Sequence, residues 1–149
     1  MSVELVTTSS PELVEAMALL VPQLSRSAEP LDATATDRLV SQESVHLFVF
    51  RADEGAPHAG RILGMLSLAT FAIPTGLRAW IEDVVVDNGA RGSGAGQALV
   101  EAALAHARTL GARTVDLTSR PSREAANRLY RRCGFRQRET NVYRYSLAD

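Results

Sequence analysis

The fold of this chain can be worked out from the stretch VVVDNGARGSGAGQALVEAALAHA, Val84–Ala107. It begins with a β-branched run typical of a strand, passes through the glycine-rich segment RGSGAG, and continues into an alanine-rich segment of helical character. A strand that ends in glycines and then begins a helix presents unpaired backbone N–H groups at the positive end of the helix dipole. The sequence therefore predicts an anion site, with phosphate as its usual ligand, at Arg91, Gly92, Gly94 and Gly96.

Two other phosphate-binding loops fit this segment less well. A P-loop requires a lysine after its last glycine, and the chain contains no lysine. A Rossmann loop requires G-x-G-x-x-G, whereas Gln97 stands here in the place of the third glycine. Asp116 lies 20 residues past Gly96, as the ribose-binding acid of that fold does, but only 33 residues follow it. A flexible surface loop remains a further alternative.

Composition predicts one globular domain over residues 1–149, with 46% hydrophobic residues. Cys133 is the single cysteine, so no internal disulfide is possible and a cytoplasmic location is expected. No apolar run is long enough to cross a membrane, and no signal peptide is apparent. His46, His58 and His106 are scattered, which argues against a bound metal.

Charge is distributed unevenly along the chain. Residues 1–75 carry a balance of −5 and residues 76–149 a balance of +4, and all 16 basic residues are arginine. This asymmetry is expected if the second half binds an anion and the first half helps to admit a cation. The aromatic residues are few and no basic stripe is long, so we expect neither a nucleic acid nor a membrane as a partner.

The order of hydrophobic patterns predicts a mixed α/β fold, with a mainly antiparallel first half followed by strand–helix–strand–helix–strand. Ser9, with Glu12 three residues on and Pro11 between them, indicates the start of a first helix, and Thr34 indicates the start of a second. Strands are expected at 3–8, 46–52, 61–71, 79–87, 113–119, 135–139 and 141–147, and further helices at 94–111 and 122–134.

A second motif, REAANRLYRRCGF (Arg123–Phe135), points to a family. Together with RGSGAG it resembles the GNAT superfamily of acetyl-CoA-dependent N-acetyltransferases. The first family motif, V-x-x-x-x-R/Q-x-x-G-x-G/A, matches Val86, Arg91, Gly94 and Gly96. The second, A-x-x-x-Y-x-x-x-G-F, matches Ala126, Tyr130, Gly134 and Phe135. The resemblance is good from about Trp80 to Phe135 and weaker over the first 75 residues.

The resemblance implies a mostly antiparallel twisted sheet of six to seven strands, splayed between strands 4 and 5 and flanked by about four helices. It implies acetyl-CoA as cosubstrate, with the pantetheine arm along the backbone of Val84, Val85 and Val86, and Asn127 as a further contact. The pyrophosphate would lie on the amides of Arg91, Gly92, Ser93, Gly94, Ala95, Gly96 and Gln97.

The resemblance also implies that Tyr130 protonates the departing thiolate and that Glu82 draws the proton from the amine. An alkyl amine is mostly ammonium at neutral pH and must lose a proton before it attacks a thioester. In a regular strand Glu82 shares a face with Val84 and Val86, and Asp83 faces the other way. Alternatively, Glu82 and Asp83 pair with arginines and Tyr130 is a core aromatic. Whether Glu82, Asp83 or only water is the base stays open.

The function expected on these grounds is transfer of an acetyl group to a primary amine of an unidentified acceptor, by direct attack in a ternary complex. A non-catalytic acyl-CoA sensor on the same fold is the alternative, and a dinucleotide-binding oxidoreductase is a distant third. A small amine or a peptide is expected as acceptor, and the resemblance implies a homodimer without sequence evidence for one.

Overall fold

A computed structural model describes residues 2–148 of the chain. The backbone divides into two compact units, Met1–Thr118 and Ser119–Asp149. The RGSGAG loop lies in the first unit and the REAANRLYRRCGF motif in the second. The prediction of one domain over residues 1–149 stays a prediction.

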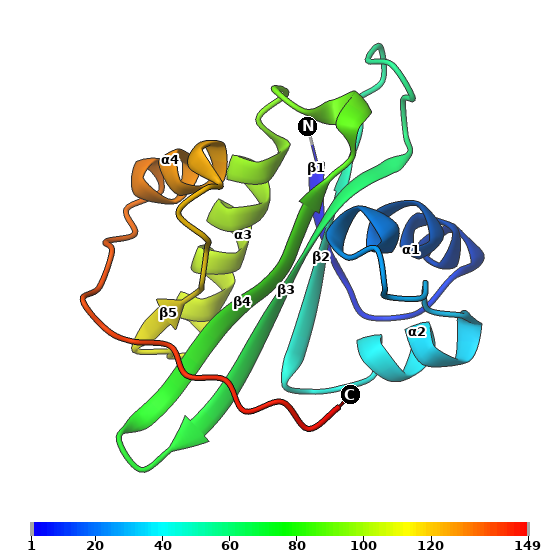
Figure 1. The fold of residues 1–149 in the computed structure, drawn as a ribbon. Helices are drawn as coiled ribbons and strands as arrows, with labels where there is room; N and C mark the ends of the chain where they lie inside the picture. Colours follow the sequence, from blue (N-terminus) through cyan, green and yellow to red (C-terminus); the bar gives the residue numbers. More distant parts are fainter. Residues whose placement is uncertain (1, 149) are drawn as a thin grey trace. The chain divides into compact units, whose positions relative to one another are not determined.

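The first unit is built on a mixed five-stranded sheet (Figure 1). Its strands follow one another in chain order, and all neighbours are antiparallel except the last pair, β4 and β5, which are parallel. The strands are β1 Ser2–Val6, β2 Val45–Arg51, β3 Ile62–Ile73, β4 Gly76–Val86 and β5 Thr114–Asp116. The fold class and the mainly antiparallel first half predicted from the sequence are therefore confirmed.

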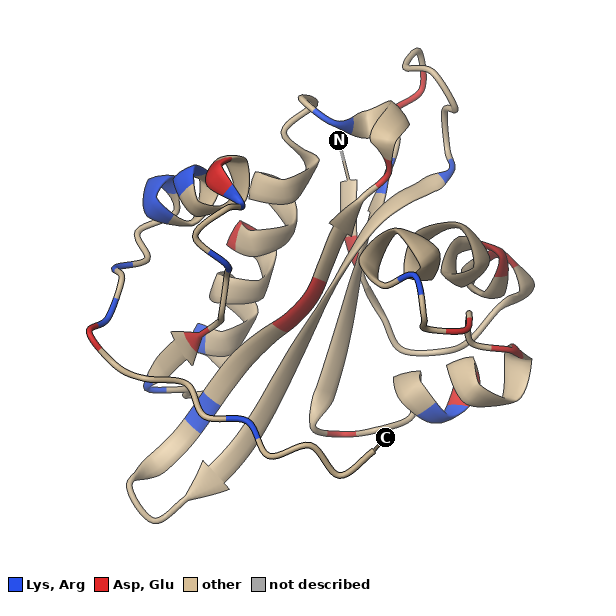
Figure 2. Ribbon diagram, viewed as in Figure 1, with Lys and Arg blue, Asp and Glu red and all other residues tan. Residues whose placement is uncertain are grey.

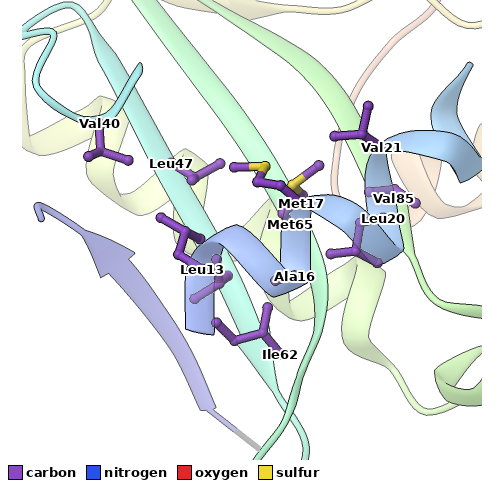
Figure 3. Close-up of a cluster of buried hydrophobic side chains, with 11 residues drawn as sticks. Leu13, Ala16, Met17, Leu20, Val21, Val40, Leu47, Ile62, Met65 and Val85 are labelled. Carbon is purple, nitrogen blue, oxygen red and sulfur yellow. The ribbon is translucent and has the colours of Figure 1, made fainter. Parts of the chain in front are cut away.

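Helices cover both faces of this sheet (Figure 1). On one face, α1 (Pro11–Leu24) and α2 (Ala33–Val40) pack over alternate residues of the strands. The cluster between them is drawn in Figure 3 and comprises Leu13, Ala16, Met17, Leu20, Val21, Val40, Leu47, Val49, Ile62, Met65 and Val85. On the other face, α3 (Ala95–Thr109) places the His106 ring edge-on to Phe48, with 5.6 Å between ring centroids. The sheet is therefore packed between two helical layers.

Both N-terminal helices begin at a different residue from the one predicted. The cap of α1 is Ser10, not Ser9, because Pro11 occupies the first helical position and the Ser10 hydroxyl accepts from the Leu13 amide at 3.1 Å. The cap of α2 is Asp32, not Thr34, since the Asp32 carboxylate accepts from the Ala35 amide at 2.8 Å.

The second unit contains α4 (Glu124–Arg132), and residues 135–148 form neither helix nor strand. The two closing strands predicted at 135–139 and 141–147 are therefore wrong, and the described sheet has five strands rather than six to seven. An alternating pattern becomes a strand only when another strand completes its hydrogen bonds. Here the apolar side chains of the last segment are exposed: Val142, Tyr143, Tyr145 and Leu147.

Candidate active site

The loop between β4 and α3 has the form that the RGSGAG motif predicts. After Val86, a single 3-10 turn, η1 (Asn88–Ala90), leads into Arg91 and then into two left-handed glycines. Gly92 has φ +79° and Gly94 has φ +87°, a region in which residues with a Cβ are strained. Gly94 is the N-cap of α3, so α3 begins without a capping side chain.

The first turn of α3 therefore offers backbone donors. The first helical hydrogen bond runs from the Ala98 amide to the Gly94 carbonyl, which leaves the amides of Ala95, Gly96 and Gln97 ahead of it. The Gln97 side chain does not cap them, because it donates to Glu101 Oε1 at 2.9 Å. These amides lie at the positive end of the helix dipole, where an anion is stabilised.

Some backbone donors of the loop are used in hydrogen bonds within the loop itself. The Ser93 amide and hydroxyl both donate to the Ala90 carbonyl, and the Arg91 amide donates to the Asn88 carbonyl at 3.5 Å. Within the predicted set Arg91–Gln97, the backbone donors toward a ligand are thus the glycines and the first turn of α3. Arg91 itself has an exposed side chain that adds a positive charge to the loop.

Asp87 holds the beginning of the loop, and the sequence analysis did not single it out. Its carboxylate accepts from Gln23 Nε2 of α1 at 2.8 Å and from the Gly89 amide at 2.9 Å. These two hydrogen bonds hold the pKa of Asp87 below its usual value, mainly through Gln23. The sequence signal that could have identified it is Asp-Asn-Gly, a turn in which the aspartate side chain bonds to the backbone two residues on.

β4 and β5 separate beside this loop, as the resemblance implies. The two strands pair only through Arg78–Thr114, Ala79–Val115 and Trp80–Asp116. Beyond Trp80, β4 is paired with β3 alone. Val84, Val85 and Val86, predicted to line the pantetheine arm, lie in this singly paired part. Their backbone on the β5 side therefore has no strand partner within the described sheet.

A β-bulge interrupts β4 within this singly paired part. Glu82 pairs with Ser67 and Val85 with Met65, so that Asp83 and Val84 together face the single residue Leu66. Asp83 takes a left-handed conformation, with φ +52°, which is uncommon for a residue with a side chain.

The bulge changes which side chains share a face. In a regular strand Glu82 would lie with Val84 and Val86; the extra residue instead places it with Val85, on the face covered by α1. The prediction from regular alternation is therefore wrong at this point. Glu82 and Asp83 are both exposed and form the acidic band in the middle of β4 in Figure 2.

Glu82 has a hydrogen-bond partner that the sequence analysis overlooked. The Trp80 indole Nε1–H donates to Glu82 Oε1 at 2.8 Å. The alternative that Glu82 and Asp83 pair with arginines finds no support among the ion pairs of the described residues. Those ion pairs join Arg51 to Glu4 and Glu12.

Gly64, which lies opposite Val86, explains how α3 approaches the sheet. A Cβ at this position would lie 3.2 Å from the Val85 carbonyl oxygen and 3.3 Å from both Leu99 Cδ1 and Phe50 Cβ. A side chain at Gly64 would require these neighbours to shift by a few tenths of an ångström, so glycine favours the close packing of Leu99 of α3 against β3.

The second unit holds the two remaining predicted site residues, Asn127 and Tyr130. Asn127 Nδ2 donates to the Arg120 carbonyl at 3.0 Å, which fastens the segment before α4 to the helix. Tyr130 is 8% exposed, and its ring packs edge-on against Phe135. Burial raises the pKa of the Tyr130 phenol, an effect that the nearby Arg123 charge opposes. The phenol is therefore protonated at neutral pH.

Among residues 2–148, no three or more histidine, cysteine or acidic side chains are grouped so that they could hold a metal ion. Over the same residues, the helices are too short or too polar to span a bilayer.

Solved structures that this chain resembles include several acetyltransferases. A Trypanosoma brucei acetyltransferase is 28% identical, with a TM-score of 0.74 and coverage of 98% of this chain and 100% of that one. An aminoglycoside acetyltransferase from an uncultured soil metagenomic sample, in complex with sisomicin, is 17% identical, with a TM-score of 0.82 and coverage of 99% and 96%. Glucosamine-6-phosphate N-acetyltransferase from Arabidopsis thaliana is 21% identical, with a TM-score of 0.74 and coverage of 97% and 99%.

No curated protein matches the sequence. The model of the Acetyltransferase (GNAT) family matches residues 13–135, from the first turns of α1 to the end of the REAANRLYRRCGF motif. That match includes the loop before α3, the bulged strand and α4. The chain therefore belongs to the GNAT acetyltransferase family, whose members are acyl-transferring enzymes.

Proposed function

We propose that this protein is an N-acetyltransferase that moves an acetyl group from acetyl-CoA to a primary amine. The observation that carries the proposal is the uncapped first turn of α3, which follows two left-handed glycines directly after a strand that has parted from its neighbour. This arrangement joins an anion-binding helix end to a strip of unpaired strand backbone.

The residues present fit coenzyme A. The amides of Gly92, Gly94, Ala95, Gly96 and Gln97, with the positive charge of Arg91, would hold the pyrophosphate. The backbone of Val84, Val85 and Val86 would pair with the amides of the pantetheine arm, because strand backbone without a neighbour can bind an extended ligand as another strand would. Asn127 is a further proposed contact to coenzyme A.

Glu82 is the proposed base. Its carboxylate is exposed and lies on the singly paired part of β4, next to the bulge. A primary alkyl amine has a pKa of about 10, so its ammonium form predominates at neutral pH and must give up a proton before the nitrogen can attack. Asp83, the neighbouring exposed carboxylate, is the alternative base.

Tyr130 is the proposed acid. A thiolate leaving group departs more easily when a proton reaches its sulfur, and a buried phenol that stays protonated at neutral pH has a proton to give. A backbone N–H of the bulge at Asp83–Val84 would stabilise negative charge on the thioester oxygen.

The test is the release of free thiol from acetyl-CoA against a panel of spermidine, kanamycin and a peptide with a free α-amino group. Acceptor-dependent release that becomes much slower, but stays measurable, in Glu82→Gln supports the proposal. Binding of acetyl-CoA without release on any acceptor would support the non-catalytic sensor. Failure of acetyl-CoA to bind would overturn the assignment of the loop.

A further inference from the structure

The hydrogen bond from Trp80 to Glu82 joins two side chains on the same face of β4. Residues two apart in a strand point the same way, and the indole Nε1–H reaches Glu82 Oε1 at 2.8 Å. Trp80 is the single tryptophan of the chain. Glutamate is a flexible side chain, and at an exposed position it would otherwise sample several rotamers.

Trp80 is carried by the part of β4 that is held most firmly. Its backbone pairs with Ala69 of β3 on one side and with Asp116 of β5 on the other, and that second pair is the last before the two strands separate. Glu82 comes two residues later, where only β3 supports the strand and the bulge begins. The backbone of Trp80 is therefore held by strands on both sides, whereas the backbone of Glu82 is held by β3 alone.

We propose that Trp80 is a positioning residue for Glu82. The indole donates a hydrogen bond to Oε1 of Glu82 and so orients Oε2 toward the amine. Oε2 then receives the proton of the amine. This inference rests on the proposed function, because it presumes that Glu82 is the base. Trp80 itself donates no proton to the substrate and receives none, and it acts only through the orientation of the carboxylate.

The first experiment uses the variant Trp80→Phe, which removes the indole N–H donor and keeps an aromatic ring. A hydrogen bond to a charged group at an exposed position is expected to be worth about a three- to tenfold change in kcat for the panel amine that is acetylated fastest. The KM for acetyl-CoA should not change. Arg78→Gln is the matched control, since Arg78 lies two residues earlier on the same face of β4. It should leave kcat as in the wild type.

A double-mutant cycle separates positioning from a merely structural role. If Trp80 acts through Glu82, Trp80→Phe causes no further loss of kcat in the Glu82→Gln background. An equal loss in both backgrounds would overturn the inference while leaving Glu82 as the base. Full kcat in Glu82→Gln alone would instead refute the proposed base, and the positioning role with it.

A weakly basic nucleophile provides a second kinetic readout. Most molecules of hydroxylamine are already neutral at neutral pH, so its nitrogen can attack without first giving up a proton to a base. The loss caused by Trp80→Phe should therefore disappear with hydroxylamine as acceptor. A loss of the same size with hydroxylamine would show that the indole acts on something other than proton transfer.

Fluorescence tests the contact without any acceptor. Because Trp80 is the single tryptophan, the emission of the protein reports its environment alone. Glu82→Ala removes the partner of the indole and should shift the emission maximum, whereas Arg78→Gln should not. An unchanged maximum in Glu82→Ala would show that the hydrogen bond is not formed in solution, and the inference would fail.

Discussion

A negative charge placed in the loop before α3 should weaken acetyl-CoA binding without disturbing the fold more than a matched change elsewhere. Gly92 and Gly111 are suited to this comparison. Both are left-handed, with φ +79° and φ +83°, and a Cβ at either would meet nothing within 4 Å. Gly92→Asp adds a carboxylate beside the proposed pyrophosphate site. Gly111→Asp adds the same carboxylate just after the last turn of α3, at the far end of that helix.

The magnitude follows from Coulomb's law. Two unit charges about 6 Å apart interact by about 1.4 kcal/mol at an effective dielectric constant of about 40, and by about 2.8 kcal/mol at about 20. We therefore expect the Kd for acetyl-CoA to rise about 10- to 100-fold in Gly92→Asp. The strain of a left-handed aspartate, about 1–2 kcal/mol in the free energy of unfolding, is common to both variants.

The assay is isothermal titration of each variant with acetyl-CoA at two salt concentrations. The difference between the variants should shrink as salt is added, because screening weakens the repulsion. Equal Kd values for the two variants would refute the assignment of the pyrophosphate to this loop. An equal loss of thermal stability without a difference in binding would show that only backbone strain had been measured.

Three further predictions concern the elements that support the loop. Gly64→Ala should lower the free energy of unfolding by about 1–3 kcal/mol in a urea titration, because its methyl group would crowd Leu99 and the adjoining strand; unchanged stability would show that α3 packs less closely than described. Asp87→Asn should destabilise the protein above the unfolded pKa of Asp87, about 3.8, and this difference should vanish as the pH falls through the lowered pKa of the folded protein, since protonation removes the same contribution from the wild type. A difference that stays constant in acid would contradict a lowered pKa. Asp83→Gly should equal or exceed the wild type in thermal stability, whereas Asp83→Val should lose about 1–2 kcal/mol, because a β-branched residue is strained at φ +52°. Equal stability of the two variants would exclude the left-handed bulge in solution.

The sequence alone determined the order of the elements as far as α4, and the form of the loop before α3. Glycine, a β-branched run and an alanine-rich helix act locally, so Gly92 and Gly94 could be placed from their neighbours in the chain. The family could also be recognised, because the spacing of Arg91, Gly94 and Gly96 is a property of the chain itself.

Only the tertiary structure decided the face on which Glu82 lies and the partner that holds it. The bulge at Asp83–Val84 is a register shift between two strands, and no local pattern encodes a count of two residues against one. The prediction of a strand at 141–147 was wrong for the same reason, because an alternating pattern forms a strand only where a partner strand pairs with it. The role of Trp80 could not be predicted, because only the structure shows that its indole N–H lies 2.8 Å from Glu82 Oε1. Local conformational preference depends on each residue and its neighbours in the chain. Strand register and side-chain pairing depend instead on which distant segments the folded chain brings together.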